Sequence, residues 1–354
     1  IYMASGSVTL INATIGGEQD YEGTDHGKTK GNKAKDGGGI YVASGTLSIK
    51  DSTLSFNKST SGSTGGGGGI NANNGTLNIK GCTFKNNDSG SGTGGGIKAD
   101  NITLTMTDCT LTDNNAGGGG GGILTSGTSS LTMETCTLTD NAANFNGGGG
   151  VYASGNAFTM TDCTLTGNVA NNNGSGAVYV AEGTFTMKGS SRITPSSGPD
   201  ENAMGKNEVF LKNGKMITVP EALTGTHPVA RITPAAYNST TQVLTAGTSV
   251  TLANETYKFA VTPKGSEEWE IGSDGKLKKA KVIDGGTEKA WKKLKDAVQS
   301  AVDGDVITIN GRIKAGKYNN NNGEITINNN ITIRGDDSSN DILDANKNVD
   351  NKPK

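Results

Sequence analysis

Four cysteines are the residues of this sequence best placed to do chemistry together, because they recur at one interval. Each lies 27 residues after the one before it, at Cys82, Cys109, Cys136 and Cys163. Such a column can be a ladder of buried thiols, a set of disulfides between neighbours or a zinc site. Stacked neighbours would need closer Cβ atoms for a disulfide than a stack prefers, and His26 and His227 lie far outside the column. We favour the reduced ladder, then disulfides, then zinc, and we expect no metal and no cofactor.

An asparagine column follows the cysteine column, five residues later in each copy. Its members are Asn57, Asn87, Asn114, Asn141 and Asn168. Stacked amides can hydrogen-bond along a column, so we favour a structural ladder over a carbohydrate-binding row. Serines extend the cysteine column at both ends, with Ser52 before Cys82 and Ser190 after Cys163.

Acidic residues align as well, Asp108 with Asp162 and Asp113 with Asp140. Stacked carboxylates repel each other, so a bound cation is one interpretation of these columns. A solvated face interleaved with lysine is the interpretation we favour.

Six copies of one sequence repeat position these columns. Gly-Gly-Gly followed by Ile or Val begins at residues 37, 67, 94, 120 and 148, and a weaker copy begins at Ser175. Each copy holds three short stretches of alternating apolar and polar residues rich in Thr, Val and Ile, which is typical of strands. The sequence therefore predicts an all-β fold, a right-handed parallel β-helix with three short strands in each coil of about 27 residues. The glycine runs predict tight corners.

The composition fits a stacked fold with a thin core. Of 354 residues 55 are Gly, and aromatic residues make up only 5%. No apolar run is long enough to span a membrane as a helix. The 32 basic and 34 acidic residues nearly cancel, which argues against a nucleic-acid partner.

The second half of the chain is less regular, and we divide the sequence into three parts. Residues 1–198 form the repeat coils, and residues 199–284 form irregular terminal coils with a small antiparallel β cap. The cap is expected to consist of Tyr257–Val261, Trp269–Ile271 and Lys276–Lys278. Residues 285–354 form a helix followed by what reads as the first coils of another β-helix.

This last part predicts one amphipathic helix between Thr287, its candidate N-cap, and Gly304, its stop. Three strands are expected after it, at Val306–Ile309, Ile325–Ile327 and Ile331–Ile333. Because the chain ends in the pattern of first coils and starts in the pattern of later ones, it reads either as a fragment of a tandem array or as a subunit that continues the next subunit. In the second interpretation the interface would contain Ile1, Val8, Leu10, Trp291, Leu294, Val298, Ile325, Ile327, Ile331 and Ile333.

The repeat resembles that of the polymorphic outer-membrane proteins, autotransporter-type surface adhesins with the repeat pattern GGA(I/L/V) and FxxN. Phe84 to Asn87 is a full FxxN, and Gly176–Ala177–Val178 keeps the small-then-aliphatic form, while Gly replaces Ala in the other five copies. The resemblance covers about residues 36–195. It implies a β-helix passenger, exposure on a bacterial surface and adhesion, and it implies no catalytic residue.

We therefore expect a non-enzymatic, extracellular or bacterial-surface structural protein that assembles head to tail into a fibre. The partners would be further copies of the chain and host or microbial surface receptors. One alternative is an adhesin module that binds host or neighbouring cells, and a second is a polysaccharide lyase or hydrolase. The enzyme is least favoured because the four arginines, Arg192, Arg231, Arg312 and Arg334, lie outside the regular coils.

Overall fold

The structure is a computed structural model, and it falls into two compact units. It describes residues 1–17, 31–63, 65–145, 147–171, 175–194, 207–265, 267–285, 290–302, 305–314, 325–335 and 343–344. Unit 1 comprises residues 1–236 and 242–262, and unit 2 comprises residues 237–241 and 263–354. The two units are described separately below.

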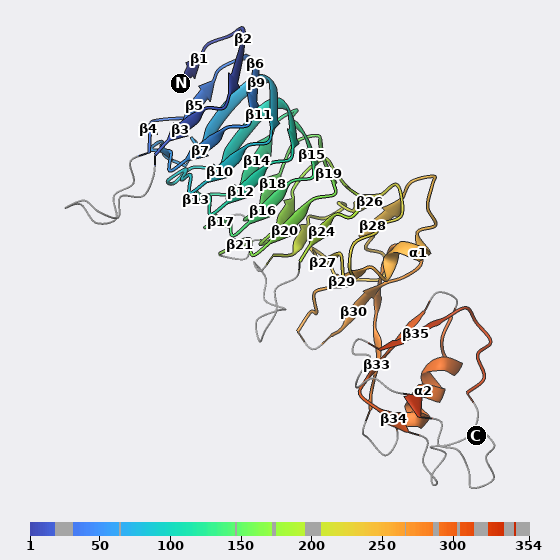
Figure 1. Cartoon of the computed structure of the whole chain (residues 1–354). Helices are drawn as coiled ribbons and strands as arrows, with labels where there is room; N and C mark the ends of the chain where they lie inside the picture. Colours follow the sequence, from blue (N-terminus) through green and yellow to red (C-terminus); the bar gives the residue numbers. More distant parts are fainter. Residues whose placement is uncertain are drawn as a thin grey trace. The chain divides into compact units, whose positions relative to one another are not determined.

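Unit 1 is a stack of coils whose strands pair in parallel from one coil to the next (Figure 1). The first strands of successive coils are β1 (Tyr2–Met3), β5 (Ile40–Val42), β9 (Ile70–Lys80), β11 (Ile97–Thr107), β14 (Ile123–Ser126), β18 (Val151–Ala153), β22 (Val178–Val180), β25 (Val209–Leu211), β27 (Ala230–Pro234) and β29 (Phe259–Val261). The second strands are β2 (Ser7–Ile11), β6 (Gly45–Lys50), β15 (Ser130–Glu134), β19 (Ala157–Thr161), β23 (Thr184–Lys188), β26 (Ile217–Val219) and β28 (Leu244–Ala246), and the long strands β9 and β11 run through both positions. The predicted parallel β-helix is thus confirmed, with about ten turns.

In the described residues, the first seven coils have a third strand, and five of these coils also have a two-residue fourth one. The third strands are β3 (Thr14–Gly16), β7 (Thr53–Ser55), β10 (Thr83–Lys85), β12 (Thr110–Thr112), β16 (Thr137–Thr139), β20 (Thr164–Thr166) and β24 (Arg192–Ile193). The fourth are β4 (Lys33–Ala34), β8 (Lys58–Ser59), β13 (Asn115–Ala116), β17 (Ala142–Ala143) and β21 (Val169–Ala170). The sequence pattern does not reveal the fourth strand because two residues are too few to show an alternation.

The core of unit 1 consists of inward-facing columns of like residues. One column runs through Leu47, Leu77, Leu104, Leu131, Phe158 and Phe185, all at most 1% exposed. The rings of Phe158 and Phe185 stack with their centroids 4.7 Å apart. Each buried side chain is covered by its counterparts in the adjacent coils, so the stack needs few apolar residues for each residue of chain.

Three corners of each coil have a left-handed backbone conformation. The glycine that opens each run has a φ between 60° and 73°, as in Gly37 and Gly120. The aligned aspartates are at the other two corners, with φ 54° for Asp108 and 56° for Asp113. Gly, Asn and Asp tolerate this conformation best. The backbone therefore accounts for the aspartate columns.

The second glycine of each run is required for a different reason, a close approach between coils. A Cβ atom on Gly95 would lie 2.4 Å from the carbonyl oxygens of Asn115 and Gly121. No side chain fits that distance from backbone atoms, so the run marks a corner where neighbouring chain segments touch.

The coils continue past the regular repeats through residues 207–262, but less regularly. Strand β29 pairs in parallel with β27, Ala230 facing Phe259. The prediction that Tyr257–Val261 belongs to an antiparallel cap is therefore wrong, since these residues form the first strand of a further coil. Just before it, the short helix α1 (Ala253–Thr256) carries Glu255, which forms a buried ion pair with Lys258 at 2.9 Å.

Unit 2 contains the antiparallel hairpin β30 (Trp269–Ile271) and β31 (Leu277–Lys279), which confirms the predicted antiparallel pairing of these segments. A parallel sheet follows, β32 (Lys281–Asp284), β33 (Val306–Asn310) and β35 (Thr332–Gly335), with a second small pair, β34 (Ile313–Lys314) and β36 (Leu343–Asp344). Helix α2 (Ala290–Gln299) covers the sheet, but Thr287 and Gly304, its predicted ends, lie outside the described residues. Ile325–Ile327 was expected to be a strand and is irregular, so that prediction is wrong. Ile327 is 54% exposed, so the alternation of apolar and polar residues here does not mark a strand that buries this side chain.

Candidate functional site: internal ladders and an outer groove

The cysteine column lies inside unit 1. All four thiols are free and at most 1% exposed. Each Sγ atom lies 3.1–3.2 Å from the carbonyl oxygen two residues before it, Lys80 in the case of Cys82, and donates to it. The column ends in Ser191 and not in Ser190, because the Cys163 backbone donates to Ser191 Oγ at 3.4 Å. One extra residue in the last copy shifts the register there.

The environment raises the pKa of three thiols, Cys82, Cys109 and Cys136, and lowers the pKa of Cys163, where the hydrogen bond with Cys136 outweighs burial. Burial raises the pKa of Cys82. A hydrogen bond with Cys136, together with burial, raises the pKa of Cys109 strongly. Protonated, enclosed thiols are poor nucleophiles and poor metal ligands. The arrangement suits packing.

The asparagine column is also internal, and its hydrogen bonds close on themselves. Asn87 Nδ2 donates to Asn114 Oδ1 at 2.9 Å and to the Leu54 carbonyl of the preceding coil at 2.8 Å. Asn114 Oδ1 also accepts the backbone N–H of Asn87 at 3.1 Å. The same pattern recurs from Asn57 to Asn168, and every side chain of the column is fully buried. The amides of this row therefore have no free donor or acceptor with which to bind a sugar.

The ladder has one further member at each end that the repeat spacing did not reveal, and at the start Asn32 Nδ2 donates to Asn57 Oδ1 at 2.9 Å. Asn168 Nδ2 donates to Asn207 Oδ1 at 3.1 Å, 39 residues later in the chain. Residues 195–206, which intervene, lie outside the described part. The signal that could have found Asn207 is its place just before Val209–Leu211, a strand like those that open the other coils.

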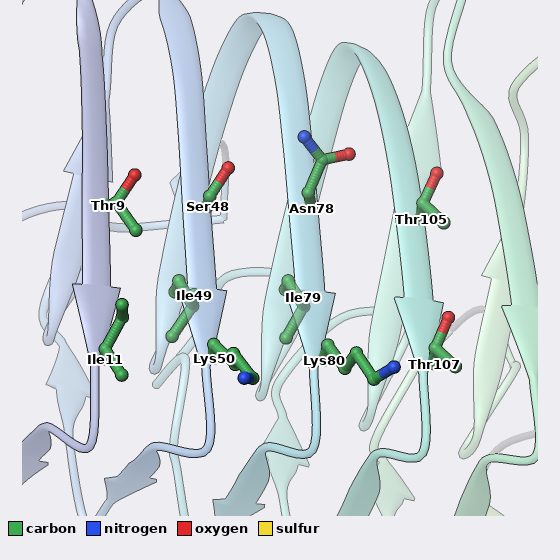
Figure 2. Close-up of a pocket in the computed structure, with 10 residues that line it drawn as sticks. All are labelled: Thr9, Ile11, Ser48, Ile49, Lys50, Asn78, Ile79, Lys80, Thr105 and Thr107. Atoms are coloured by element: carbon green, nitrogen blue, oxygen red, sulfur yellow. The ribbon is translucent and has the colours of Figure 1, made fainter.

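The outer face of the second strands carries a groove across four coils, on β2, β6, β9 and β11. Figure 2 shows its two rows of outward side chains. The hollow has a volume of about 280 Å³. One row is polar and uncharged and consists of Thr9, Ser48, Asn78 and Thr105; the other consists of Ile11, Lys50, Lys80 and Thr107.

The charge of the groove comes from its two lysines. No lining residue is acidic. Asp51 at the neighbouring corner lies 3.5 Å from Lys50 Nζ, in a pair that is about half exposed. The groove therefore combines hydroxyl and amide groups, one exposed apolar side chain and positive charge, which suits a polar ligand with negative groups. We name the surface formed by these two rows the outer groove.

The residues expected at an assembly interface are placed unequally. Ile1 is 57% exposed, and Val8 and Leu10 are half-buried. Trp291, Leu294 and Val298 are buried in the core of unit 2, because the apolar face of α2 packs with isoleucines of β32, β33 and β34, and so they do not face outward as expected. The remaining members of the set are Ile325, Ile331 and Ile333, which pack partly against that core, and the exposed Ile327.

A buried carboxyl group lies in unit 2, on strand β30. Glu270 is 6% exposed, and its Oε2 atom has no hydrogen-bond partner. Burial raises the pKa of Glu270 to about 7, although Arg334 and a backbone hydrogen bond from Val306 oppose the shift. Asp305, nearby, binds Lys281 at 2.8 Å and Lys278 at 3.4 Å. The described residues contain no cluster of three or more side chains suited to a metal ion.

Comparison with known proteins gives one match. A family model described as "Right handed beta helix region" matches residues 1–197, more than half of the chain. It also supports the predicted handedness. No curated protein and no solved structure gives a significant match. In the part of the chain that the structure describes, no helix is long and apolar enough to cross a membrane.

Proposed function

Because the chain belongs to the right-handed β-helix family, we propose that it is a non-enzymatic protein of the bacterial surface whose coils display a binding face. In this proposal unit 1 is an adhesin-type module and the outer groove contacts the partner. The observation that carries the proposal is the groove itself, a hollow that crosses four coils between two rows of outward side chains (Figure 2). The resemblance of the repeat to the polymorphic outer-membrane proteins supports an extracellular location.

The interior of the coils supports the proposal physically. Side chains on the outer face stand on strands whose opposite faces are buried, through Leu47, Leu77 and Leu104 in one column and Ile49, Ile79 and Met106 in the next. Threonine, a β-branched residue, has few rotamers on such a strand. A surface that is ordered before binding loses less conformational entropy on association, which favours a recognition role.

The experiment is a binding assay with the purified chain on fixed bacterial and host cells. We expect saturable binding that decreases when the groove is filled by the double variant Ser48→Tyr and Thr105→Tyr. The matched control is Thr137→Tyr and Thr164→Tyr, which changes exposed threonines of the third-strand face. Equal binding by both variants would contradict the proposal. Release of sugar ends from a glycan panel would instead establish the lyase or hydrolase alternative.

A fibre built from successive copies is a second candidate, because the coils of unit 1 pair in parallel, a pairing that a coil of another copy could continue. Electron microscopy should then show filaments of residues 1–354 that disappear when residues 285–354 are deleted. Monodisperse particles at all concentrations would exclude the fibre.

A further inference from the structure

The two lysines of the outer groove are stacked on each other. Lys50 of β6 and Lys80 of β9 are partners in register, and strands of neighbouring coils lie about 4.8 Å apart. Like charges directly opposite each other destabilise a sheet. The neighbours in this row, Ile11 and Thr107, carry no charge that would compensate the pair.

Another stacked lysine pair shows how the fold compensates such a charge elsewhere. Lys33 and Lys58 are also partners in register, and Lys58 Nζ lies 2.6 Å from the Asp88 carboxylate of the next coil. Lys80 Nζ has no ion-pair partner in the described part of the chain, and Lys50 Nζ has only the exposed contact with Asp51 at 3.5 Å. The groove pair thus carries positive charge that its surroundings leave largely free.

The polar row beside the lysines also has free hydrogen-bonding groups. Thr9, Ser48, Asn78 and Thr105 occupy equivalent positions, one for each coil. None of these four side chains forms a hydrogen bond within the described residues, in contrast to the buried Asn87 and Asn114, whose amides are fully used. Donors and acceptors therefore repeat along the groove at the coil spacing.

We propose that the outer groove binds an acidic polysaccharide, which lies across the coils with its anionic groups on Lys50 and Lys80. This inference rests on the proposed function and names the ligand class for the same surface. Sugar hydroxyls would pair with the polar row, and the exposed Ile11 offers an apolar contact for a sugar ring. An extended acidic peptide is a poorer fit, because its side chains on one face repeat about every 6.6 Å while the coils repeat at about 4.8 Å.

The test measures binding of the full chain to three polymers at low salt: polygalacturonate, neutral dextran and poly-glutamate. We expect saturable binding to polygalacturonate that weakens as salt rises, because exposed charges are screened. The double variant Lys50→Gln and Lys80→Gln should weaken this binding about tenfold, in line with the loss of two exposed ion pairs. The matched control, Lys33→Gln and Lys58→Gln, removes the same charge from another stacked pair and should change the affinity less than twofold.

The variant Ser48→Tyr provides a second test that leaves the charge of the groove unchanged. It should also weaken binding of polygalacturonate, because the larger side chain fills the groove. Equal losses in the two lysine variants would overturn the proposal, since they would indicate non-specific attraction. Equal binding of poly-glutamate or of dextran would overturn the assignment to an acidic polysaccharide. If the chain binds cells in a groove-dependent way but binds none of the acidic glycans, this inference fails and the proposed function stands. If cell binding is absent as well, both fail.

Discussion

Two buried polar groups, one in each unit, are in contrasting situations. In unit 1 the amide of Asn114 is fully buried and bonds to its own counterparts, Asn87 and Asn141. In unit 2 the carboxyl group of Glu270 is almost as buried, yet one of its oxygens has no partner. The repeat provides each asparagine of this column with a complementary copy of itself one coil away. Unit 2 has no repeat that could supply such a partner, and there burial raises the pKa of Glu270, so that its carboxyl group keeps its proton and stays uncharged to a higher pH.

The test with the largest expected effect removes one member of the asparagine ladder. Asn114→Ala removes the partner of two donors of Asn87 and a donor to the Phe84 carbonyl, and it leaves the Asn141 oxygen with only the backbone N–H of residue 114. At about 1–3 kcal/mol for an unsatisfied buried group, we expect a loss of about 4 kcal/mol in the free energy of unfolding. Chemical denaturation followed by circular dichroism measures it. The control, Asn78→Ala, changes an exposed amide on β9 of the same unit and should cost less than about 0.5 kcal/mol. A ladder variant as stable as this control would show that the amide bonds contribute little.

The next largest effect tests the other side of the comparison. The folded-state pKa of Glu270 is about 7, above the ordinary 4.5, so the folded unit retains a proton that the unfolded chain loses. Stability of unit 2 is therefore greatest below about pH 4.5 as far as this group is concerned, and it decreases as pH rises to 7. The total decrease is about 3 kcal/mol, at 1.36 kcal/mol for each pKa unit.

Tryptophan fluorescence can follow this effect separately, because Trp269 and Trp291, the two tryptophans of the chain, both lie in unit 2. Glu270→Gln keeps the shape and cannot ionise, so its unfolding should lose the dependence between pH 4.5 and 7. Glu268→Gln, an exposed neighbour, is the control and should keep the dependence. A wild-type protein whose fluorescence transition does not move over this range would show that Glu270 is not buried as described.

A smaller effect concerns the one threonine in a corner column. Thr135 has a φ of 50°, where Asp108 and Asp162 are its counterparts. A β-branched residue is strained in the left-handed region, by roughly 1 kcal/mol. Thr135→Asn should therefore stabilise unit 1 by about 1 kcal/mol in chemical denaturation. Thr137→Asn, on the adjacent strand and not at a corner, should give no gain, and a gain of equal size there would remove the conformational explanation.

The smallest effect is expected in the thiol ladder. Cys109→Ser places a hydroxyl where Ser52 and Ser191 already end the column, and Ser52 Oγ donates to the Lys50 carbonyl at 2.7 Å. Since the new hydroxyl has the Thr107 carbonyl in the equivalent position, we expect a loss below about 1 kcal/mol. In the folded wild type the four thiols should not react with a thiol reagent, and all should react in denaturant. Rapid labelling of the native protein would contradict their burial.

The sequence predicts unit 1 well because its information is repeated. The 27-residue spacing placed both columns, and the structure adds their direction and their hydrogen bonds. The spacing fails where the register slips, as at Ser191, or where an insertion intervenes, as before Asn207. Alignment of the copies could also have revealed the outer groove, since Lys50 and Lys80 hold the same place in successive copies.

Unit 2 was harder to predict for a physical reason. Its helix shows a clear apolar face, and Trp291, Leu294 and Val298 do pack together. The burial of Glu270 depends on β33 packing against a hairpin that is distant in sequence, and neither segment repeats. A local pattern cannot distinguish such a residue from an exposed glutamate on the outer face of a strand.

The asparagine ladder also gives unit 1 an electrical direction. From Asn57 to Asn168 each amide Nδ2 donates to the Oδ1 of the asparagine in the later coil, and each Oδ1 accepts from the asparagine of the earlier one. The amide-to-amide bonds therefore all run the same way along the axis, whereas backbone groups of successive residues bond to the later and to the earlier coil in turn, as Ile40 and Tyr41 do. Hydrogen-bonded chains of this kind polarise each other, so each added coil strengthens the bonds of the coils before it. The two ends of the stack thus differ in polarity even where their sequences are alike, and a substitution in the middle divides one long polarised chain into two short ones.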